Sequence, residues 1–160
     1  RPIFEKVNIN EIILGSIGMT KLANQKLSIT SNLDKITQIK LRADSNLINQ
    51  ALNNLFKNSI NAINEKTKSE HNGKIHIELR KSKDNCYLDF LDNGPGFPDN
   101  KEYLLEPYIS RSKKGSGLGL AVVKKIMEDH KGTIELGSNP HERGAKVRLI
   151  FPLNRKSEFN

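Results

Sequence analysis

Two glycine-rich stretches, DNGPGF at 92–97 and KGSGLGL at 114–120, constrain the fold more than any other feature of this sequence. The first follows a strand-like alternation of polar and apolar residues, and the second runs directly into a helical pattern. Glycine loses more backbone freedom on folding than any other residue, so dense glycine is costly unless the chain must approach something closely. We therefore expect a close backbone approach at both stretches.

The patterns around these stretches predict one α+β domain over residues 1–153, followed by a flexible tail at 154–160. Helical spacing of apolar residues indicates helices at 9–23, 44–66 and 117–132, with Asp44 or Ser45 as the cap of the second and Gly132 as the stop of the third. Alternating residues predict a pair of strands at 26–30 and 37–43, and further strands at 74–81, 86–92, 133–138 and 145–151. The order predicts helices on one face of a mixed, mostly antiparallel sheet.

Composition excludes several classes of protein. The 160 residues carry a formal net charge of +8, but the lysines are spread along the chain, which favours compositional bias over a nucleic-acid footprint. The single cysteine, Cys86, lies in an apolar alternation, and we expect a buried structural thiol in a reducing, cytoplasmic setting. No apolar run approaches the ~18 residues that span a bilayer. The chain starts at Arg1 rather than Met, and we expect it to be a piece of a longer protein.

The second glycine stretch is suited to holding an anion. The first N–H groups of a helix lack internal partners and carry the positive end of its dipole, and Gly115, Gly117 and Gly119 leave room for phosphates to reach them. Lys113 and Lys114 add positive charge. Neither the Walker order nor the dinucleotide fingerprint is present. The alternative is a flexible hinge.

The first stretch is suited to a flat ligand. A carboxylate at Asp92, with Gly94 and Gly96 folding the backbone back, can accept a hydrogen bond from an exocyclic amine such as that of adenine. The alternative is a plain Asp-Asn-Gly turn, which the stretch alone favours.

Polar side chains share one face of the helix predicted at 44–66. Asparagine is a mediocre helix former, so three of them in one stripe require a reason, and an amide oxygen suits Mg²⁺ bound together with nucleotide phosphates. The alternative is a solvated polar face. The stripe consists of Gln50, Asn54, Lys57, Asn58, Asn61 and Glu65.

Taken together, these motifs resemble the catalytic and ATP-binding domain of sensor histidine kinases over residues 9–152. NNLFKNSINAI resembles the N box, DNGPGF the G1 box, LLEPY the F-box region and KGSGLGL the G2 box. The run at 106–132 is most similar to NtrY-type nitrogen-regulation kinases. The resemblance implies the Bergerat fold, a two-layer α/β sandwich with about three helices on one face and a mobile ATP lid at about 98–114.

The resemblance also implies roles for individual residues. Asn58 would hold Mg²⁺, Asp92 would bind adenine, and Gly94 and Gly96 would shape the base pocket. Asn54 and Lys57 would line the phosphate side, and Gly115, Ser116, Gly117, Leu118 and Gly119 would wrap the phosphates. The other residues implied to bind ATP are Asn61, Arg111 and Lys114. Two departures bear on these roles. Ala145 stands where related sequences usually have Thr or Ser, and the lid reads Ser110-Arg111-Ser112 where many relatives have Thr-Thr-Arg.

An amide at Asn54 favours transfer of the ATP γ-phosphate to histidine. Related ATPases and serine kinases carry a glutamate base there, which water or a serine hydroxyl needs and a neutral imidazole does not. A Bergerat-type ATPase or anti-sigma-type serine kinase, and a non-catalytic nucleotide-sensing module, remain the alternatives. His71, His76, His130 and His141 all lie in poor contexts for a phosphoacceptor. We therefore expect the acceptor histidine on a separate dimerisation domain. The full-length protein is expected to be a homodimeric, membrane-anchored sensor whose ATP-binding domain lies in the cytoplasm and whose partner is a response regulator.

Overall fold

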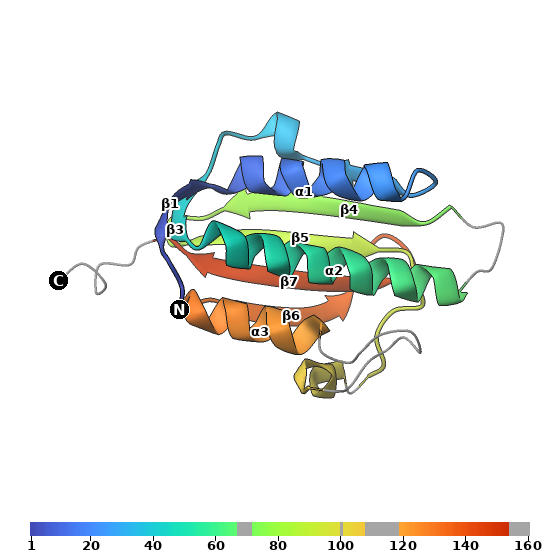
Figure 1. Cartoon of the computed structure of the whole chain (residues 1–160). Helices are drawn as coiled ribbons and strands as arrows, with labels where there is room; N and C mark the ends of the chain where they lie inside the picture. The colour runs from blue at the N-terminus through green and yellow to red at the C-terminus, as the bar shows by residue number, and fades with distance from the viewer. Residues whose placement is uncertain (67–71, 100, 108–118, 154–160) are drawn as a thin grey trace.

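The structure is a computed structural model that describes residues 1–66, 72–99, 101–107 and 119–153 (Figure 1). In chain order its elements are β1 (Glu5–Asn8), α1 (Ile9–Ala23), β2 (Ser28–Ser31), the 3₁₀ helix η1 (Leu33–Lys35), β3 (Lys40–Ala43), α2 (Ser45–Lys66), β4 (Lys74–Lys81), β5 (Asn85–Asp92), the 3₁₀ helix η2 (Lys101–Leu105), α3 (Gly119–Asp129), β6 (Thr133–Ser138) and β7 (Ala145–Pro152). No helix in these ranges combines the length and apolar character needed to cross a membrane.

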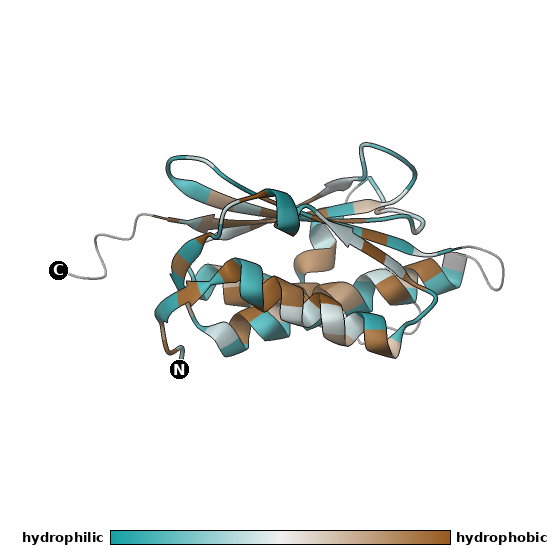
Figure 2. Ribbon diagram, turned by 90° about the horizontal axis from the view of Figure 1, so that it is seen from above, coloured by the Kyte–Doolittle hydropathy of each residue, from teal (hydrophilic) through white to brown (hydrophobic). Residues whose placement is uncertain are grey.

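The elements form two layers. Five strands make one sheet in the order β2-β4-β5-β7-β6, in which only the β2–β4 pairing is parallel. The three α-helices cover one face of this sheet, and Figure 2 shows that the other face carries no α-helix of the described chain. The predicted fold class, an α/β sandwich with a mixed, mostly antiparallel sheet, is confirmed.

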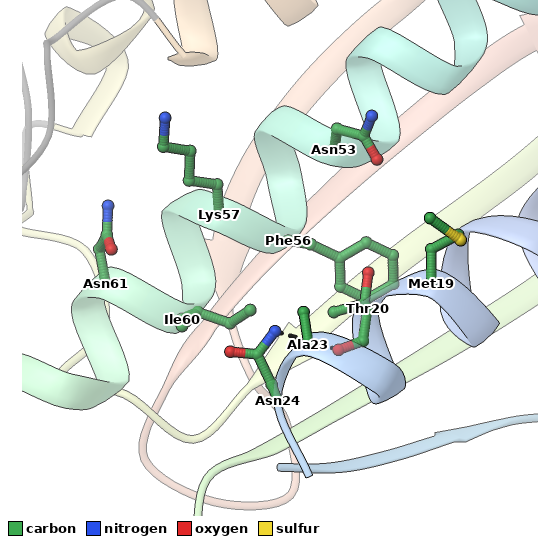
Figure 3. A pocket seen from close by; sticks show the side chains of 9 residues that line it. All are labelled: Met19, Thr20, Ala23, Asn24, Asn53, Phe56, Lys57, Ile60 and Asn61. Carbon is green, nitrogen blue, oxygen red and sulfur yellow. Dashed lines mark hydrogen bonds between the residues drawn. The ribbon is translucent and has the colours of Figure 1, made fainter.

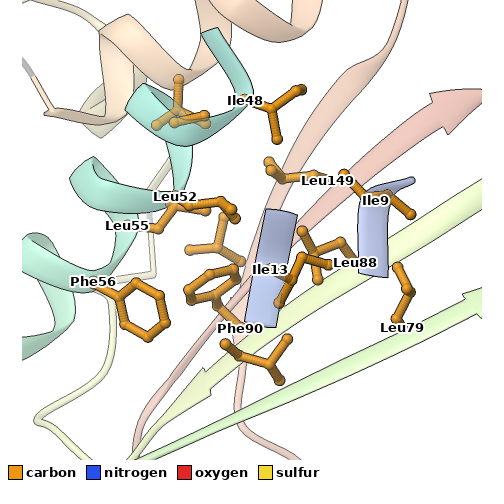
Figure 4. Packing of buried hydrophobic residues seen from close by; sticks show 14 of the residues in the cluster. Ile9, Ile13, Ile48, Leu52, Leu55, Phe56, Leu79, Leu88, Phe90 and Leu149 are labelled. Atoms are coloured by element: carbon orange, nitrogen blue, oxygen red, sulfur yellow. The ribbon is translucent and has the colours of Figure 1, made fainter. Parts of the chain in front are cut away.

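The core lies between the helices and the sheet. The apolar side of α2 places Ile48, Leu52 and Leu55 at its centre, and Phe56 packs edge-on against Phe90 of β5 with ring centroids 5.1 Å apart (Figure 4). Along β4 and β7, fully buried residues alternate with more accessible ones, as in half-buried strands. Cys86 is buried in this core as expected, and burial raises the pKa of its thiol to about 12.

The two strands predicted at 26–30 and 37–43 exist, but they do not pair with each other. β2 runs parallel to β4, while β3 pairs antiparallel with β1, which was not predicted. Asn32 separates the two strands because its side chain bonds both the carbonyl and the N–H of Leu79 at 2.8 Å. Residues 37–39 are not in β3, and the carbonyl of Ile39 instead accepts the N–H of Ile9 at the start of α1. These contacts place β2 in the large sheet and leave β3 outside it.

A clamp joins the end of α3 to the start of α2. His130 is completely buried, its Nδ1–H donates to the Ile126 carbonyl at 2.7 Å, and its Nε2 accepts the N–H of Asp44 at 3.0 Å. Asp44 caps α2, because its Oδ1 accepts the N–H groups of Asn46 and Leu47. This arrangement fixes α2, the helix with the asparagine stripe, at its N-terminal end.

The end of α3 differs from the prediction. The helix ends at Asp129, and the residue with a left-handed backbone is Lys131, at φ 59°, rather than Gly132. Gly132 is needed for space, because a Cβ there would overlap the carbonyl oxygen of Ile150 in β7. The glycine therefore permits close packing of the chain on the sheet.

Candidate nucleotide-binding site

Asp92 lies at the end of β5 with its carboxylate held in one orientation. Its Oδ1 accepts two backbone N–H groups, from Gly94 and from Ala145, both at 3.0 Å. The residue is only 3% exposed. A buried carboxylate that accepts N–H groups from two separate segments is positioned rather than solvated, which a simple surface turn does not require.

Three glycines let the chain fold around Asp92. A Cβ on Gly94 would lie 3.3 Å from Asp92 Oδ1 and 3.4 Å from the backbone nitrogen of Ile63 in α2. Gly96 has φ +86° and lies against the carbonyl of Gly144. Gly144 has φ +155°, and a Cβ there would overlap the carbonyl oxygen of Asp92. The close backbone approach expected at the first glycine stretch is therefore present. Gly144 is a third glycine of this turn, and the stretch at 92–97 did not indicate it.

Two asparagines that the sequence did not single out lock the same turn. Asn93 is almost fully buried, accepts the N–H of Lys74 at 2.8 Å and donates to the carbonyl of Asn72 at 3.1 Å. Asn139, after β6, donates its side-chain amide to the carbonyl of Asp92 at 2.9 Å. The only feature of the sequence that could have indicated these two asparagines is that each lies in a turn next to the end of a strand. Together they join the start of β4, the end of β5 and the β6–β7 loop.

The polar stripe of α2 lies beside this turn. Asn54, Asn58 and Asn61 are half-buried and Lys57 is exposed. Figure 3 shows Lys57 and Asn61 projecting from α2 on the side away from Phe56 and Ile60. The same helix places Ile63 against Gly94, so the stripe and the Asp92 turn belong to one region. The stripe can thus offer amide oxygens and one cation to a ligand that begins at Asp92.

Several predicted residues lie outside the described part of the chain. These are Arg111, Lys114, Gly115, Ser116, Gly117 and Leu118, together with positions 100 and 108–114 of the predicted lid. Gly119 is described as the first residue of α3, where a Cβ would meet no atom within 4 Å. In the described part of the lid, Leu104 of η2 is buried in the core.

The described histidines have local roles. His130 belongs to the clamp, and His76 contacts Thr30 at 2.7 Å and Glu78 at 2.8 Å on β4. His141 is exposed in the β6–β7 loop, while His71 falls outside the described residues. Among the described side chains there is no cluster of three or more His, Cys, Asp or Glu that could hold a metal ion. The predicted magnesium site therefore depends on the amide of Asn58.

Comparison with known proteins points to one family. Residues 43–155 match the model of the histidine kinase-, DNA gyrase B- and HSP90-like ATPases. The chain is 34% identical over 153 residues to the nitrogen regulation protein NtrY of Azorhizobium caulinodans, covering 94% of this chain and 20% of that protein. It is 30% identical to the sensor histidine kinase ZraS of Escherichia coli O157:H7, covering 95% of this chain and 34% of that protein. The chain thus spans a fifth to a third of the length of these two relatives.

Solved structures agree. The catalytic domain of histidine kinase ThkA superposes with a TM-score of 0.78 at 27% identity, covering 96% of this chain and 99% of that one. The mycobacterial sensor histidine kinase MprB has the same fold, with a TM-score of 0.80 at 22% identity over 94% of this chain and 97% of that one. ThkA has also been solved in complex with the response regulator TrrA.

Proposed function

The chain belongs to the family of histidine kinase-, DNA gyrase B- and HSP90-like ATPases, and we propose that it is the ATP-binding catalytic domain of an NtrY-type two-component sensor kinase. Its substrates in this proposal are ATP and a histidine on a separate dimerisation domain. The observation that carries the proposal is the Asp92 carboxylate, which Gly94 and Ala145 hold beside the asparagine stripe of α2. The high similarity to histidine kinases over most of the chain supports it.

In this proposal each end of the site binds one end of ATP. Asp92 accepts the N–H of the adenine amino group, and Gly94 and Gly96 give the base room. Asn54, Lys57 and Asn61 lie along the phosphates, and 111–119 complete the phosphate side. Asn58 would hold Mg²⁺ through its amide oxygen, a hard neutral ligand that fits this ion. The ion would neutralise phosphate charge during transfer.

Asn54 has an amide, which cannot act as a general base, and the proposed reaction is therefore one that needs no base: transfer of the γ-phosphate to a histidine. A lone pair on a ring nitrogen of the acceptor histidine attacks the γ-phosphorus, and the bond from that phosphorus to the β–γ bridging oxygen breaks. ADP leaves with the electron pair, and the proton on the other ring nitrogen is then released. A neutral imidazole needs no deprotonation before attack, whereas water or a serine hydroxyl does. The amide at position 54 therefore supports transfer to histidine over the ATPase and serine-kinase alternatives.

The partners follow from the same proposal. The full-length protein would dimerise through its phosphoacceptor domain, pass the phosphoryl group to a response regulator, and be anchored in the inner membrane with this domain on the cytoplasmic side. The structure of ThkA with TrrA supports the regulator as a partner.

Incubation with γ-labelled ATP and Mg²⁺ tests the proposal. We expect no label on this chain alone and acid-labile label on a histidine-bearing acceptor domain of an NtrY-type kinase supplied in trans. Acid-stable label on a protein would support the serine-kinase alternative, and release of free phosphate without protein labelling would support the ATPase. Nucleotide binding with neither outcome would support the sensing module. Stoichiometric acid-labile label on His141 or another histidine of this chain would contradict the separate acceptor.

A further inference from the structure

A cavity of about 340 Å³ lies on the face of the sheet that carries no α-helix of the described chain (Figure 2). We call it the β2–β4 cavity. Leu91 of β5 lines it and is only 7% exposed, although it points away from the helices. The volume is at the lower end of the ~300–1,000 Å³ range of small-molecule sites. Four exposed or half-exposed strand residues line it as well, Ser28 and Thr30 of β2 and Lys74 and His76 of β4, and the parallel register sets the two pairs side by side.

The β6–β7 loop forms another wall of the cavity and also positions Asp92. Asn139 and His141 line the cavity from this loop. The side chain of Asn139 donates to the carbonyl of Asp92 at 2.9 Å and accepts the N–H of His141 at 2.9 Å. Its backbone N–H donates to the carbonyl of Gly144 at 3.0 Å, next to the Ala145 N–H that holds the Asp92 carboxylate. One loop therefore contacts both the cavity and the proposed adenine ligand.

The start of β4 is tied to the same turn. The N–H of Lys74 donates to the side-chain oxygen of Asn93 at 2.8 Å, and the carbonyl of Lys74 accepts the N–H of Asn93 at 3.2 Å. A ligand that bridges the Lys74 side chain and the β6–β7 loop would therefore hold together two segments that both bond the Asp92 turn. Two sites that order the same segments bind their ligands cooperatively.

Thr30, His76 and Glu78 form a hydrogen-bonded chain at the cavity. Nδ1 of His76 lies 2.7 Å from Oγ1 of Thr30, and its Nε2 lies 2.8 Å from Oε1 of Glu78. A carboxylate only accepts hydrogen bonds, so Nε2 carries a proton. When the ring is neutral, Nδ1 accepts the hydroxyl hydrogen of Thr30. When the ring is protonated, Nδ1–H donates to Oγ1 instead, and the hydroxyl hydrogen can then be donated to a ligand in the cavity.

The lining of the cavity consists mainly of hydrogen-bond donors. Lys74 supplies an ammonium group, β2 supplies two hydroxyls, and His76 and His141 supply imidazoles. Among the described residues that line it, the one carboxylate is that of Glu142, which is exposed on the loop. The imidazoles do not form a metal site, because no cluster of three or more His, Cys, Asp or Glu in the described ranges could hold an ion. An oxyanion is the ligand that these donors fit.

We propose that the β2–β4 cavity binds a small molecule through its phosphate or carboxylate group, and that this binding strengthens the binding of adenine nucleotides at Asp92. Lys74 pairs with the oxyanion, and the hydroxyl of Thr30 donates to it when His76 is protonated. The anion site stands on the cavity alone, whereas its effect on adenine nucleotides rests on the proposed function. The site lies on the opposite face of the sheet from the Asp92 side chain, because successive side chains of a strand alternate.

Binding should increase as the pH falls, because the anion favours the protonated form of His76. The titratable groups near this ring are Lys74 and Glu78 on β4, Asp89 diagonally across on β5, where it pairs with Arg148, and His141 and Glu142 of the β6–β7 loop. β2 is described over its full length and has no titratable group. Sulfate keeps its charge where imidazoles titrate, so it should bind more tightly at about pH 6 than at about pH 8. His76→Gln should lose most of this difference, and an undiminished difference in that variant would contradict the role of His76.

Titration of the whole chain with sulfate, inorganic phosphate or malonate tests the site directly. The ionic strength is held constant and Mg²⁺·ADP is present, so that the proposed phosphate side is filled. Thr30→Val removes the hydroxyl and keeps the shape of the side chain. Thr133→Val is its matched control, because Thr133 is exposed on β6 of the same sheet and does not line the cavity. Lys74→Gln is compared in the same way with Lys83→Gln, an exposed lysine outside the cavity.

We expect Thr30→Val and Lys74→Gln to weaken anion binding about tenfold, as loss of a hydrogen bond to a charged group does, and the two controls to match the wild type. Tighter binding of sulfate and phosphate than of malonate would identify a phosphorylated ligand, and the reverse order a carboxylate ligand. Equal affinities in Thr30→Val, Lys74→Gln and their controls, or no saturable binding of any of the three anions, would overturn the site.

The effect on nucleotide binding is measured as ADP affinity with and without saturating anion. In the wild type and in Thr133→Val the affinity should rise about fivefold. In Thr30→Val it should not rise, because only competition of the anion for the phosphate side remains. An equal change in the wild type and in Thr30→Val would overturn the coupling. If ADP does not bind at all, the proposed function fails, and the anion titration of the nucleotide-free chain then decides the site by itself.

Discussion

The N–H of Ala145, at the start of β7, donates to the carboxylate of Asp92, at the end of β5, over 3.0 Å. The contact uses the backbone, so it does not need the hydroxyl that related sequences usually carry at position 145. It depends instead on the path of the chain through Gly144, which lies against the carbonyl of Asp92. The orientation of Asp92, the residue proposed to bind adenine, therefore depends on Gly144, which lies 52 positions away in the sequence.

Gly144→Ala should destabilise the domain and weaken ATP binding together. A Cβ would overlap the carbonyl of Asp92, and φ +155° is a backbone conformation that residues with a side chain rarely adopt. We expect a loss of at least ~2 kcal/mol in the free energy of unfolding, measured by urea titration.

Gly137→Ala is the control for this prediction. Gly137 lies in β6, where a Cβ would be 3.5 Å from the flexible Lys146 side chain, an ordinary contact. Its unfolding free energy should change by no more than ~0.5 kcal/mol. Equal stability of the two variants would show that the turn tolerates a side chain and that the Gly144 contact is unimportant.

Stability should depend on pH through Asp44. The hydrogen bond from the N–H of Ile3 holds the pKa of this carboxyl below its usual value, and those from Leu47 and Asn46 add to the effect against the opposing effect of burial. A carboxyl whose pKa is lower in the folded than in the unfolded state stabilises the folded protein. This stabilisation is fully present above the unfolded pKa of ~3.9 and is lost as the pH falls through the folded pKa.

Asp44→Ala should therefore lower the free energy of unfolding by ~1–2 kcal/mol at pH 7, as loss of a helix cap does, and by less at pH 3. Asp34→Ala, in the exposed first turn of η1, should stay within ~0.5 kcal/mol at both pH values. Urea titrations at the two pH values measure the difference. A pH-independent effect of Asp44→Ala would mean that the charge of the carboxylate does not matter.

Local patterns were sufficient for most elements of the fold. The helix at 44–66 and the strands at 74–81 and 86–92 lie within one residue of α2, β4 and β5. Their apolar residues repeat at 3.6 or 2 positions, and each buries one face against the other layer. The Asp92 turn was also indicated, because two of its three glycines, Gly94 and Gly96, lie within four residues of Asp92.

The missed features are long-range ones. β1 has four residues with one buried side chain, too few for a clear alternation, and it forms only because β3 lies beside it. Asn139 and Gly144 act on Asp92 from the far end of the chain. The order of residues near each of them carries no sign of that contact. Pairings across such separations are set by the packed sheet rather than by local sequence.

Asn58→Ala should abolish the magnesium-dependent part of ATP affinity and leave the fold intact. The amide oxygen of a half-buried asparagine on the polar stripe is the proposed ligand, and alanine offers none. ATP titrations with and without Mg²⁺ measure the effect. Asn49→Ala is the control, because Asn49 is exposed on the same helix outside the stripe. If Mg²⁺ still improves ATP binding to Asn58→Ala as much as to wild type, the asparagines form only a solvated face.

The most direct test of an adenine site at Asp92 is a competition titration with ATP, GTP and tripolyphosphate on the wild type and on Asp92→Asn. This variant can still accept the N–H groups of Gly94 and Ala145, but it replaces one carboxylate oxygen with a donor. Adenine presents an N–H at position 6 and guanine a carbonyl, so wild type should favour ATP over GTP at least ~10-fold, below the ~10⁴-fold reached in favourable polar sites. The variant should lose that preference while its affinity for tripolyphosphate is unchanged. Equal competition by GTP and ATP on the wild type, or an unaltered preference in Asp92→Asn, would contradict an adenine site at Asp92.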